Sequence, residues 1–232
     1  MLKVRASRTL DGGDFGWLKA KHHFAVSPEG NPANEPLGAL VVWNDDQIAP
    51  GTGFGLHGHA NMEIVTYVRE GTVTHRDSMG SVGSTAAGDV QAMSAGTGIR
   101  HSEHNLGNEV LRLFQIWLRP RVNGGEPRWE TRRFPKSERA NELVVLASGW
   151  SGDGEALPLR ADARVLGATL LAGSRLEHDL GDLRHAYLAP ARGIVDVNGH
   201  RLAVGDGIAA IDERCLMIAA VEDSELILVV TT

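Results

Sequence analysis

The stretch GLHGHANMEIVTYVREGTVTHRDSMG, from Gly55 to Gly80, decides the fold class. Two of its runs, "MEIVTYV" from Met62 and "GTVTH" from Gly71, are short, rich in β-branched residues and separated by charge and glycine. Runs of this kind predict strands bounded by turns. Two histidines one residue apart, His57 and His59, precede them and raise the question of a bound metal.

The rest of the chain shows the same pattern of short apolar runs separated by glycines. Its 28 glycines are spread between short apolar runs such as "GALVVW", "VLRLFQIWL" and "ELILVV". No segment sustains helical periodicity for more than about two turns, so helix is expected to be a minor component. The sequence therefore predicts an all-β protein.

A polar segment rich in glycine, proline and charge divides the chain and predicts a linker. We expect an N-terminal unit over residues 1–125, a linker over 126–141 and a C-terminal unit over 142–232. The order "GTVTH" then "GDVQAMSAG" in the first unit is echoed by "GIVDVNGHRLAVGDGIAAID" in the second. The echo suggests a duplicated β-barrel or double-sheet unit, whose second copy lacks paired metal ligands.

Composition excludes several functional classes. The 232 residues carry a net charge of -6 without a long basic run, which argues against direct binding of nucleic acid. The single cysteine, Cys215, excludes an internal disulfide and is expected to be buried in "RCLMIAAV". The N-terminus lacks the apolar core of a signal peptide, and no apolar run is long enough to span a membrane. We expect a cytoplasmic protein without membrane contact.

Two pairs of potential ligands carry the functional argument. Residues i and i+2 of a strand point to the same face, so His57 and His59 can converge on one ion. In "GTGIRHSEHN", His101 and Glu103 repeat this spacing after a glycine-rich loop. Three imidazoles and one carboxylate leave up to two of six coordination positions free, which suits iron, manganese, nickel or copper in catalysis better than a structural zinc site.

Other candidates are weaker. Glu63 shares parity with His57 and His59 and is either a further ligand or, as we favour, a hydrogen-bond acceptor that fixes an imidazole tautomer. His75 and His104 are expected at the surface or beside a ligand rather than on the metal. The remaining histidines lack a partner at ligand spacing and are expected to be structural or solvated: His22, His23, His178, His185 and His200.

The motif block from about Trp43 to Pro120 resembles the pirin family within the cupin superfamily, which includes bacterial quercetin 2,3-dioxygenases. The resemblance lies in "GFGLHGHANMEIVTYVREGTVTHRDSMG", "GDVQAMSAGTGIRHSEHN" and "QIWLRP". It implies a bicupin, with two double-stranded β-helix (jelly-roll) barrels packed face to face. The opening "GWLKAKHHFAV" departs from the family's usual start, which leaves the local pocket lining open, and the second half matches only in general character.

The resemblance implies one divalent metal ion, usually Fe(II), held by the same four residues, His57, His59, His101 and Glu103; Mn, Ni, Cu and Zn stay open. It also implies a dioxygenase that cleaves flavonols such as quercetin with O2 and releases carbon monoxide, with Glu103 as the candidate catalytic base. The rival function is an iron-containing redox sensor that regulates a protein partner. A cupin isomerase or other sugar-binding enzyme, and a bicupin acting on another substrate, are further alternatives. A monomer is expected.

Overall fold

The computed structural model describes residues 1–26, 30–181 and 185–232. Over these residues the regular structure consists of strands and two short 3-10 helices, η1 (Ser7–Thr9) and η2 (Lys136–Arg139). The all-β prediction is confirmed. The strands β4 (Leu40–Ile48) and β11 (Leu111–Leu118) pair along their length, and each has a buried residue at both ends.

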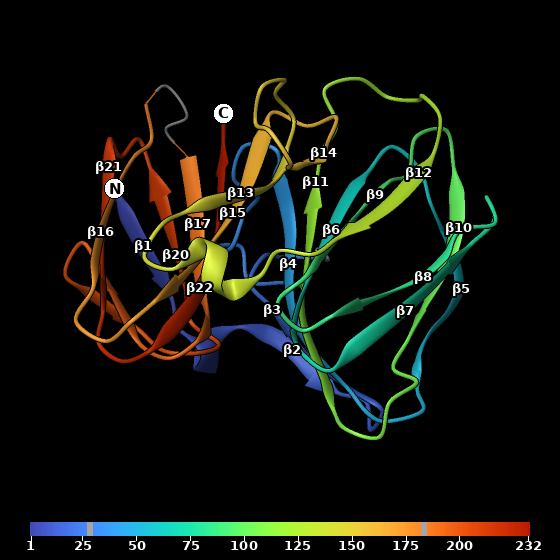
Figure 1. Ribbon diagram of the computed structural model, residues 1–232, viewed down its shortest axis with the longest axis horizontal. Helices are drawn as coiled ribbons and strands as arrows, with labels where there is room; N and C mark the ends of the chain where they lie inside the picture. The colour runs from blue at the N-terminus through green and yellow to red at the C-terminus, as the bar shows by residue number, and fades with distance from the viewer. Residues whose placement is uncertain (27–29, 182–184) are drawn as a thin grey trace.

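The N-terminal barrel is formed by two sheets that face each other (Figure 1). Among the described residues, the larger sheet has the order β12 (Arg128–Arg132), β9 (Val90–Ser94), β6 (Glu63–Glu70), β11, β4, β3 (Leu18–His22) and β2 (Asp11–Asp14). The smaller sheet has the order β5 (Gly53–His59), β10 (Ile99–His104), β7 (Thr72–Asp77) and β8 (Val82–Ala86).

The C-terminal barrel repeats this plan. In the described part of the chain its larger sheet runs β1 (Leu2–Arg5), β20 (Gly207–Ile211), β17 (His185–Arg192), β22 (Ser224–Thr231), β15 (Ala163–Leu170), β13 (Val144–Ser148) and β14 (Leu157–Pro158). Its smaller sheet runs β16 (Arg175–Asp179), β21 (Cys215–Ala220), β18 (Val195–Val197) and β19 (His200–Leu202).

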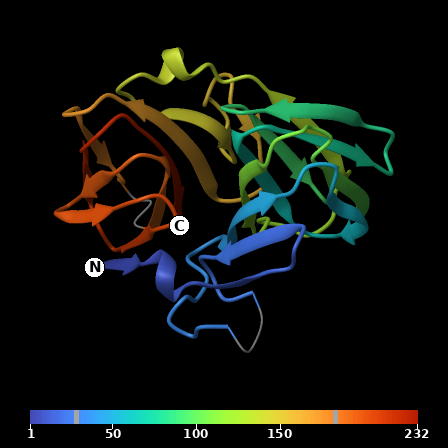
Figure 2. The same ribbon diagram turned by 90° about the horizontal axis from the view of Figure 1, so that it is seen from below.

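The two larger sheets pack against each other through one shared apolar core. Trp43 and Phe114 from the first barrel belong to the same buried cluster as Tyr187 and Val229 from the second. The ring of Trp43 lies 5.2 Å from Phe114 and 5.2 Å from Tyr187, measured between centroids. The face-to-face bicupin arrangement is confirmed, and Figure 2 shows the two barrels side by side.

Buried polar contacts cross the same boundary. The guanidinium of Arg69 forms an ion pair with Asp45 at 2.5 Å and donates a hydrogen bond from Nε to the carbonyl of Ala191 in the second barrel. The hydroxyl of Tyr67 donates to the carboxylate of Glu225 at 2.7 Å. Since each buried charge has a partner, these contacts set the alignment of the barrels without leaving an isolated ion.

The interiors of the two barrels differ in polarity. The C-terminal barrel is filled by one continuous apolar cluster that includes Leu188 and Leu228. The N-terminal barrel has two smaller apolar clusters, and a row of polar side chains crosses its larger sheet: Asn44, Gln115, Thr66 and Gln91 are direct cross-strand neighbours. Buried polar side chains require partners, so the first barrel is built to hold polar groups.

Three features differ from the expectations. The segment predicted as a linker over 126–141 contains β12, an edge strand that pairs with β9 from Arg128 to Arg132. The strand β1 falls within the predicted N-terminal unit over 1–125 but pairs with β20 of the other barrel. The division of the chain at 125 and 142 itself stays a prediction. Cys215 is half-buried, because it shares the outward parity of the exposed Met217 on β21.

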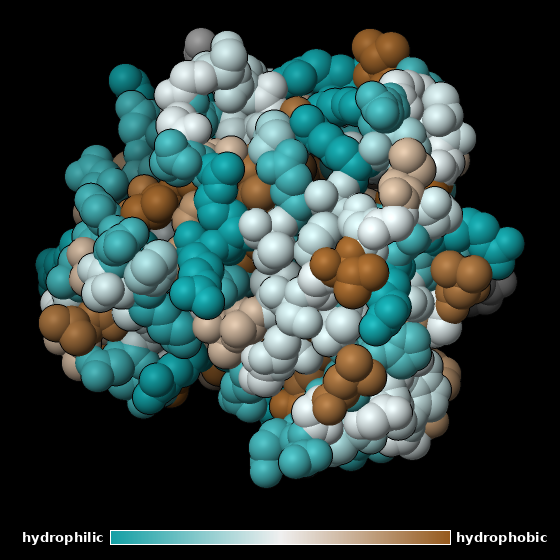
Figure 3. All heavy atoms as spheres, turned by 45° about the vertical axis from the view of Figure 1, so that its right-hand side comes forward, coloured by the Kyte–Doolittle hydropathy of each residue, from teal (hydrophilic) through white to brown (hydrophobic). Residues whose placement is uncertain are grey.

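The face of the N-terminal barrel is mixed in character. Figure 3 shows separate hydrophobic patches within neutral and hydrophilic surface. Exposed apolar side chains of this barrel include Leu56, Met79 and Val82. Single exposed apolar residues are ordinary for a folded protein and need no partner to explain them.

Candidate metal centre

The pairing of β5 with β10 brings the two ligand pairs together. His57 is the direct cross-strand partner of His101, and His59 is the partner of Ile99. The ladder shifts register between His101 and Glu103, because β5 contributes an extra residue there and Phe54 becomes the partner of Glu103. Gly53 permits the close approach at this bulge, because a Cβ there would lie 2.2 Å from the carbonyl oxygen of Glu103.

Three imidazoles converge inside the barrel. The ring centroids lie 4.4 Å apart for His57 and His101, 4.8 Å for His57 and His59, and 5.1 Å for His59 and His101. One potential ligand nitrogen from each ring lies within 4.8 Å of the others. An ion between the three nitrogens would be within reach of all of them after small side-chain adjustments.

The protonation and hydrogen bonding of these rings fit a metal. Burial and the neighbouring imidazoles lower the pKa of His101 to about 3 and that of His59 to about 4, so both rings are neutral at pH 7. His57 donates from Nδ1 to the carbonyl of Gly55 at 2.8 Å, which leaves the lone pair of Nε2 available. Both ring nitrogens of the buried His101 lack a hydrogen-bond partner among the described residues, a costly arrangement that an ion would relieve.

Glu103 lies deeper than the three imidazoles. Its two carboxylate oxygens accept hydrogen bonds from Gln91 at 2.5 Å and Gln115 at 2.7 Å. Burial outweighs these hydrogen bonds and raises the pKa of Glu103 to about 7. Glu103 forms a second potential ligand group with His101 and His75, in which each residue offers a ligand atom within 4.8 Å of the others. It does not belong to the group formed by His57, His59 and His101.

The carboxylate of Glu63 lies elsewhere. It accepts hydrogen bonds from the hydroxyl of Ser94 at 2.6 Å and from the backbone N–H of Arg160 in the second barrel at 3.0 Å. Among the described residues it accepts from no histidine, so the expected role in fixing an imidazole tautomer is not what the structure shows. Glu63 instead links the two barrels.

His75 lies beside His101, with ring centroids 5.3 Å apart, which is one of the two positions expected for it. It has no exposed surface, and its Nε2 is paired with the carboxylate of Asp77 at 2.9 Å. The sequence signal for this buried pair is the spacing His75-x-Asp77, which repeats the i, i+2 pattern of the ligand pairs. His104, the other weak candidate, is half-buried on β10 and joins neither ligand group among the described residues.

The remaining histidines fit structural or solvated roles. Buried His23 contacts the hydroxyl of Tyr187 through Nδ1 at 2.7 Å, at the boundary between the barrels. No potential metal-binding group in the described ranges contains any of the five: His22, His23, His178, His185 and His200. Both such groups found there belong to the N-terminal barrel.

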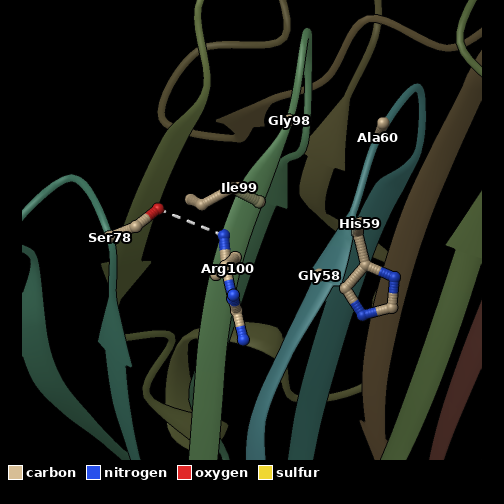
Figure 4. Close-up of a pocket in the computed structure, with 7 residues that line it drawn as sticks. All are labelled: Gly58, His59, Ala60, Ser78, Gly98, Ile99 and Arg100. Atoms are coloured by element: carbon tan, nitrogen blue, oxygen red, sulfur yellow. Dashed lines mark hydrogen bonds between the residues drawn. The ribbon is translucent and has the colours of Figure 1, made fainter.

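An open pocket of about 420 Å³ has His59, one of the three histidines, in its lining. Its walls come from the end of β5, where His59 lies, and from the start of β10, where Ile99 and Arg100 lie (Figure 4). Ser78 closes the other side and accepts a hydrogen bond from the backbone N–H of Arg100 at 3.1 Å. On the inner side, the indole of Trp117 packs edge-on against His59 with centroids 4.9 Å apart.

In the described parts of the chain, no helix has the length and apolar character needed to cross a bilayer.

Comparisons with known proteins agree with this architecture. A family model described as Pirin matches residues 3–118, and one described as a quercetinase C-terminal cupin domain matches residues 145–229. A pirin-like protein of Caulobacter vibrioides is 56% identical over 95% of both chains. A quercetin 2,3-dioxygenase of Escherichia coli K12 is 39% identical over 98% of this chain and 97% of its own length.

Solved structures give the same result. The crystal structure of YhhW from Escherichia coli superimposes with a TM-score of 0.93 at 39% identity, covering 100% of this chain and 98% of that one. A second structure, of bacterial pirin YhhW in complex with nickel(II), gives a TM-score of 0.92 at 38% identity and covers 100% and 99% of the two chains.

Proposed function

Because the chain belongs to the pirin family, we propose that it is a metal-dependent dioxygenase that cleaves a flavonol such as quercetin with O2 and releases carbon monoxide. The observation that carries the proposal is the convergence of three imidazoles, with both nitrogens of buried His101 left without a partner among the described residues. The relatives named quercetin 2,3-dioxygenase and the nickel complex of a relative support it.

The metal centre in this proposal consists of His57, His59, His101 and Glu103, with Fe(II) as the preferred ion. When bound, such an ion supplies Lewis acidity and, for iron, one-electron chemistry. His57 offers Nε2, since its Nδ1 proton is committed to the carbonyl of Gly55. Glu103 would supply a carboxylate oxygen as the fourth ligand, and a ligand atom of it lies within 4.8 Å of one of His101.

Glu103 is also the proposed catalytic base, which takes the proton of the flavonol 3-hydroxyl. A pKa of about 7 suits this role, because a general base works best when its pKa lies near the working pH. Gln91 and Gln115 hold the carboxylate in place through its two oxygens. A Glu103→Gln protein that kept both its metal and full turnover would overturn the base role.

The first test measures metal content by plasma mass spectrometry together with O2 consumption on quercetin, in the wild type and His59→Ala. We expect stoichiometric metal and quercetin-dependent O2 uptake in the wild type, with both lost in the variant. His104→Ala is the matched control, because it removes a histidine of β10 that belongs to neither ligand group.

The other outcomes discriminate among the alternatives. Metal without O2 uptake would contradict the dioxygenase and favour the redox sensor with a regulatory protein partner, which is then sought with the iron in each oxidation state. Failure of reconstituted wild-type protein to bind metal would overturn the centre itself.

A further inference from the structure

A second buried pair, His75 and Asp77, lies directly beside the candidate ligands. In the ladder between β7 and β10, His75 is the cross-strand partner of Glu103, and Asp77 is the partner of His101. The side chains of His75 and Asp77 have no exposed surface. The pair is therefore part of the wall of the polar compartment, and nothing in the proposed reaction has yet used it.

The surroundings fix the orientation of His75. The Oδ1 atom of Asp77 accepts hydrogen bonds from the backbone N–H groups of Met79 at 2.9 Å and Ser81 at 3.0 Å. Its Oδ2 atom is left for Nε2 of His75, at 2.9 Å. An ionised carboxylate only accepts hydrogen bonds, so the Nε2 of His75 carries the proton and Nδ1 carries the lone pair.

Stacking restrains the same ring. The indole of Trp129 lies over His75 with centroids 4.6 Å apart and planes 5° from parallel. Gly83 on β8 makes room for this indole, since a Cβ there would lie 2.4 Å from it. His75 thus has a fixed plane and a fixed tautomer, and its free lone pair cannot turn toward solvent.

His101 lies between His75 and the outer imidazoles. Its ring centroid is 5.3 Å from that of His75 and 4.4 Å from that of His57. Nδ1 of His75 and both ring nitrogens of His101 are buried without a partner in the described residues. If one nitrogen of His101 binds the ion shared with His57 and His59, the other carries a proton that requires an acceptor.

We propose that His75, held by Asp77, is the positioning residue that accepts the second N–H of His101 through its Nδ1 lone pair and so orients His101 toward the metal. The inference rests on the proposed metal centre and adds the chain Asp77, His75, His101 behind it. An acceptor of this kind fixes the tautomer of a ligating imidazole and raises its basicity, and its loss typically weakens metal binding 10- to 100-fold.

The sharpest variant is Asp77→Asn. An asparagine can still accept the two backbone hydrogen bonds through Oδ1, but its amide donates to Nε2 of His75, which moves the proton of His75 to Nδ1. His75 then presents a donor to His101 instead of an acceptor. His75→Leu removes the acceptor outright. Asp153→Asn is the matched control, because Asp153 likewise accepts several hydrogen bonds but lies in the second barrel.

Two measurements on the full-length protein test the inference. Ni(II) affinity by chelator competition should fall 10- to 100-fold in Asp77→Asn and His75→Leu and stay unchanged in Asp153→Asn. Nitrogen-15 NMR of histidine-labelled, Zn(II)-loaded wild type should show His75 protonated at Nε2 and free of metal, and Asp77→Asn should show it protonated at Nδ1. A folding defect alone would not move the proton between these two atoms.

Contrary results are separable. Tight wild-type binding with unchanged Ni(II) affinity in Asp77→Asn would overturn this inference and leave the metal centre intact. A metal-coordinated Nδ1 on His75 in the NMR spectrum would also overturn it, because His75 would then be a ligand. Absence of stoichiometric Ni(II) in the wild type would overturn the proposed centre and the inference with it.

Discussion

Replacing the buried Asp46 by asparagine should make the metal-free protein more stable, by an amount that grows with pH. Asp46 lies on β4 with 1% of its surface exposed, and its Oδ1 has no partner among the described residues. Burial raises its pKa from 3.8 to about 8, and the neighbouring carboxylates of Asp45 and Glu103 add to the effect. The carboxyl is therefore protonated in the folded state at neutral pH.

The sign follows from the protons bound in each state. Between about pH 4 and pH 8 the unfolded chain has released the Asp46 proton and the folded chain still holds it, so stability falls as pH rises through this window. At about 1.4 kcal/mol per pH unit, the loss attributable to one carboxyl from pH 5 to pH 7 is at most about 3 kcal/mol. Asparagine has a similar shape and does not titrate.

Urea unfolding followed by tryptophan fluorescence, on chelator-treated protein at several pH values from 5 to 7, measures the effect. The advantage of Asp46→Asn over the wild type should increase across this range, by up to about 3 kcal/mol. Glu130→Gln, which removes one exposed negative charge from β12, should run parallel to the wild type. If Asp46→Asn also ran parallel, Asp46 would be ionised in the folded state and the reasoning would be refuted.

Three further predictions concern other parts of the structure. Gln115→Leu removes a hydrogen bond to the carboxylate of Glu103, so the acid limb of the kcat/KM profile on quercetin should move about 1–2 pH units higher; an unmoved limb would show that Glu103 is not the base. Leu188→Ala should destabilise the protein by about 2–5 kcal/mol through a cavity in the C-terminal barrel, while Ni(II) affinity stays unchanged. Arg69→Met leaves the buried carboxylate of Asp45 without its partner and should lower the free energy of unfolding, measured in urea, by about 3–5 kcal/mol. Adding Asp45→Asn should recover part of that loss. Equal losses for the single and double variants would contradict a buried charge pair.

The sequence was sufficient for whatever depends on local spacing. Strands follow from short alternating runs, and the i, i+2 rule selects His57, His59 and His101, which the structure brings together. That these residues hold an ion remains a proposal. The depth of Glu103 could not be read in the same way, because its carboxylate is held by Gln91 and Gln115, which belong to strands β9 and β11 of the other sheet.

Long-range pairing explains what the sequence analysis missed. The sequence cannot show that His75 lies beside the candidate ligands, because this follows from the pairing of β7 with β10. The carboxylate of Glu63 accepts a hydrogen bond from the backbone N–H of Arg160, which lies 97 residues away in the second barrel. The polar sequence of β12 is typical of a linker, and its strand structure becomes clear only from its pairing with β9. In each case the deciding partner is distant in the chain, where local propensity carries no information.

The pairing of β1 with β20 has a consequence for the order of events on the ribosome. Leu2 is opposite Ala210, so β1 waits for its partner until the roughly 200 residues between them have been translated, roughly 10–40 s at about 5–20 residues per second. Throughout that time it is a nascent segment with free backbone edges. Lys3 and Arg5 place two positive charges within its four residues, a feature that discourages adhesion to other unfinished chains.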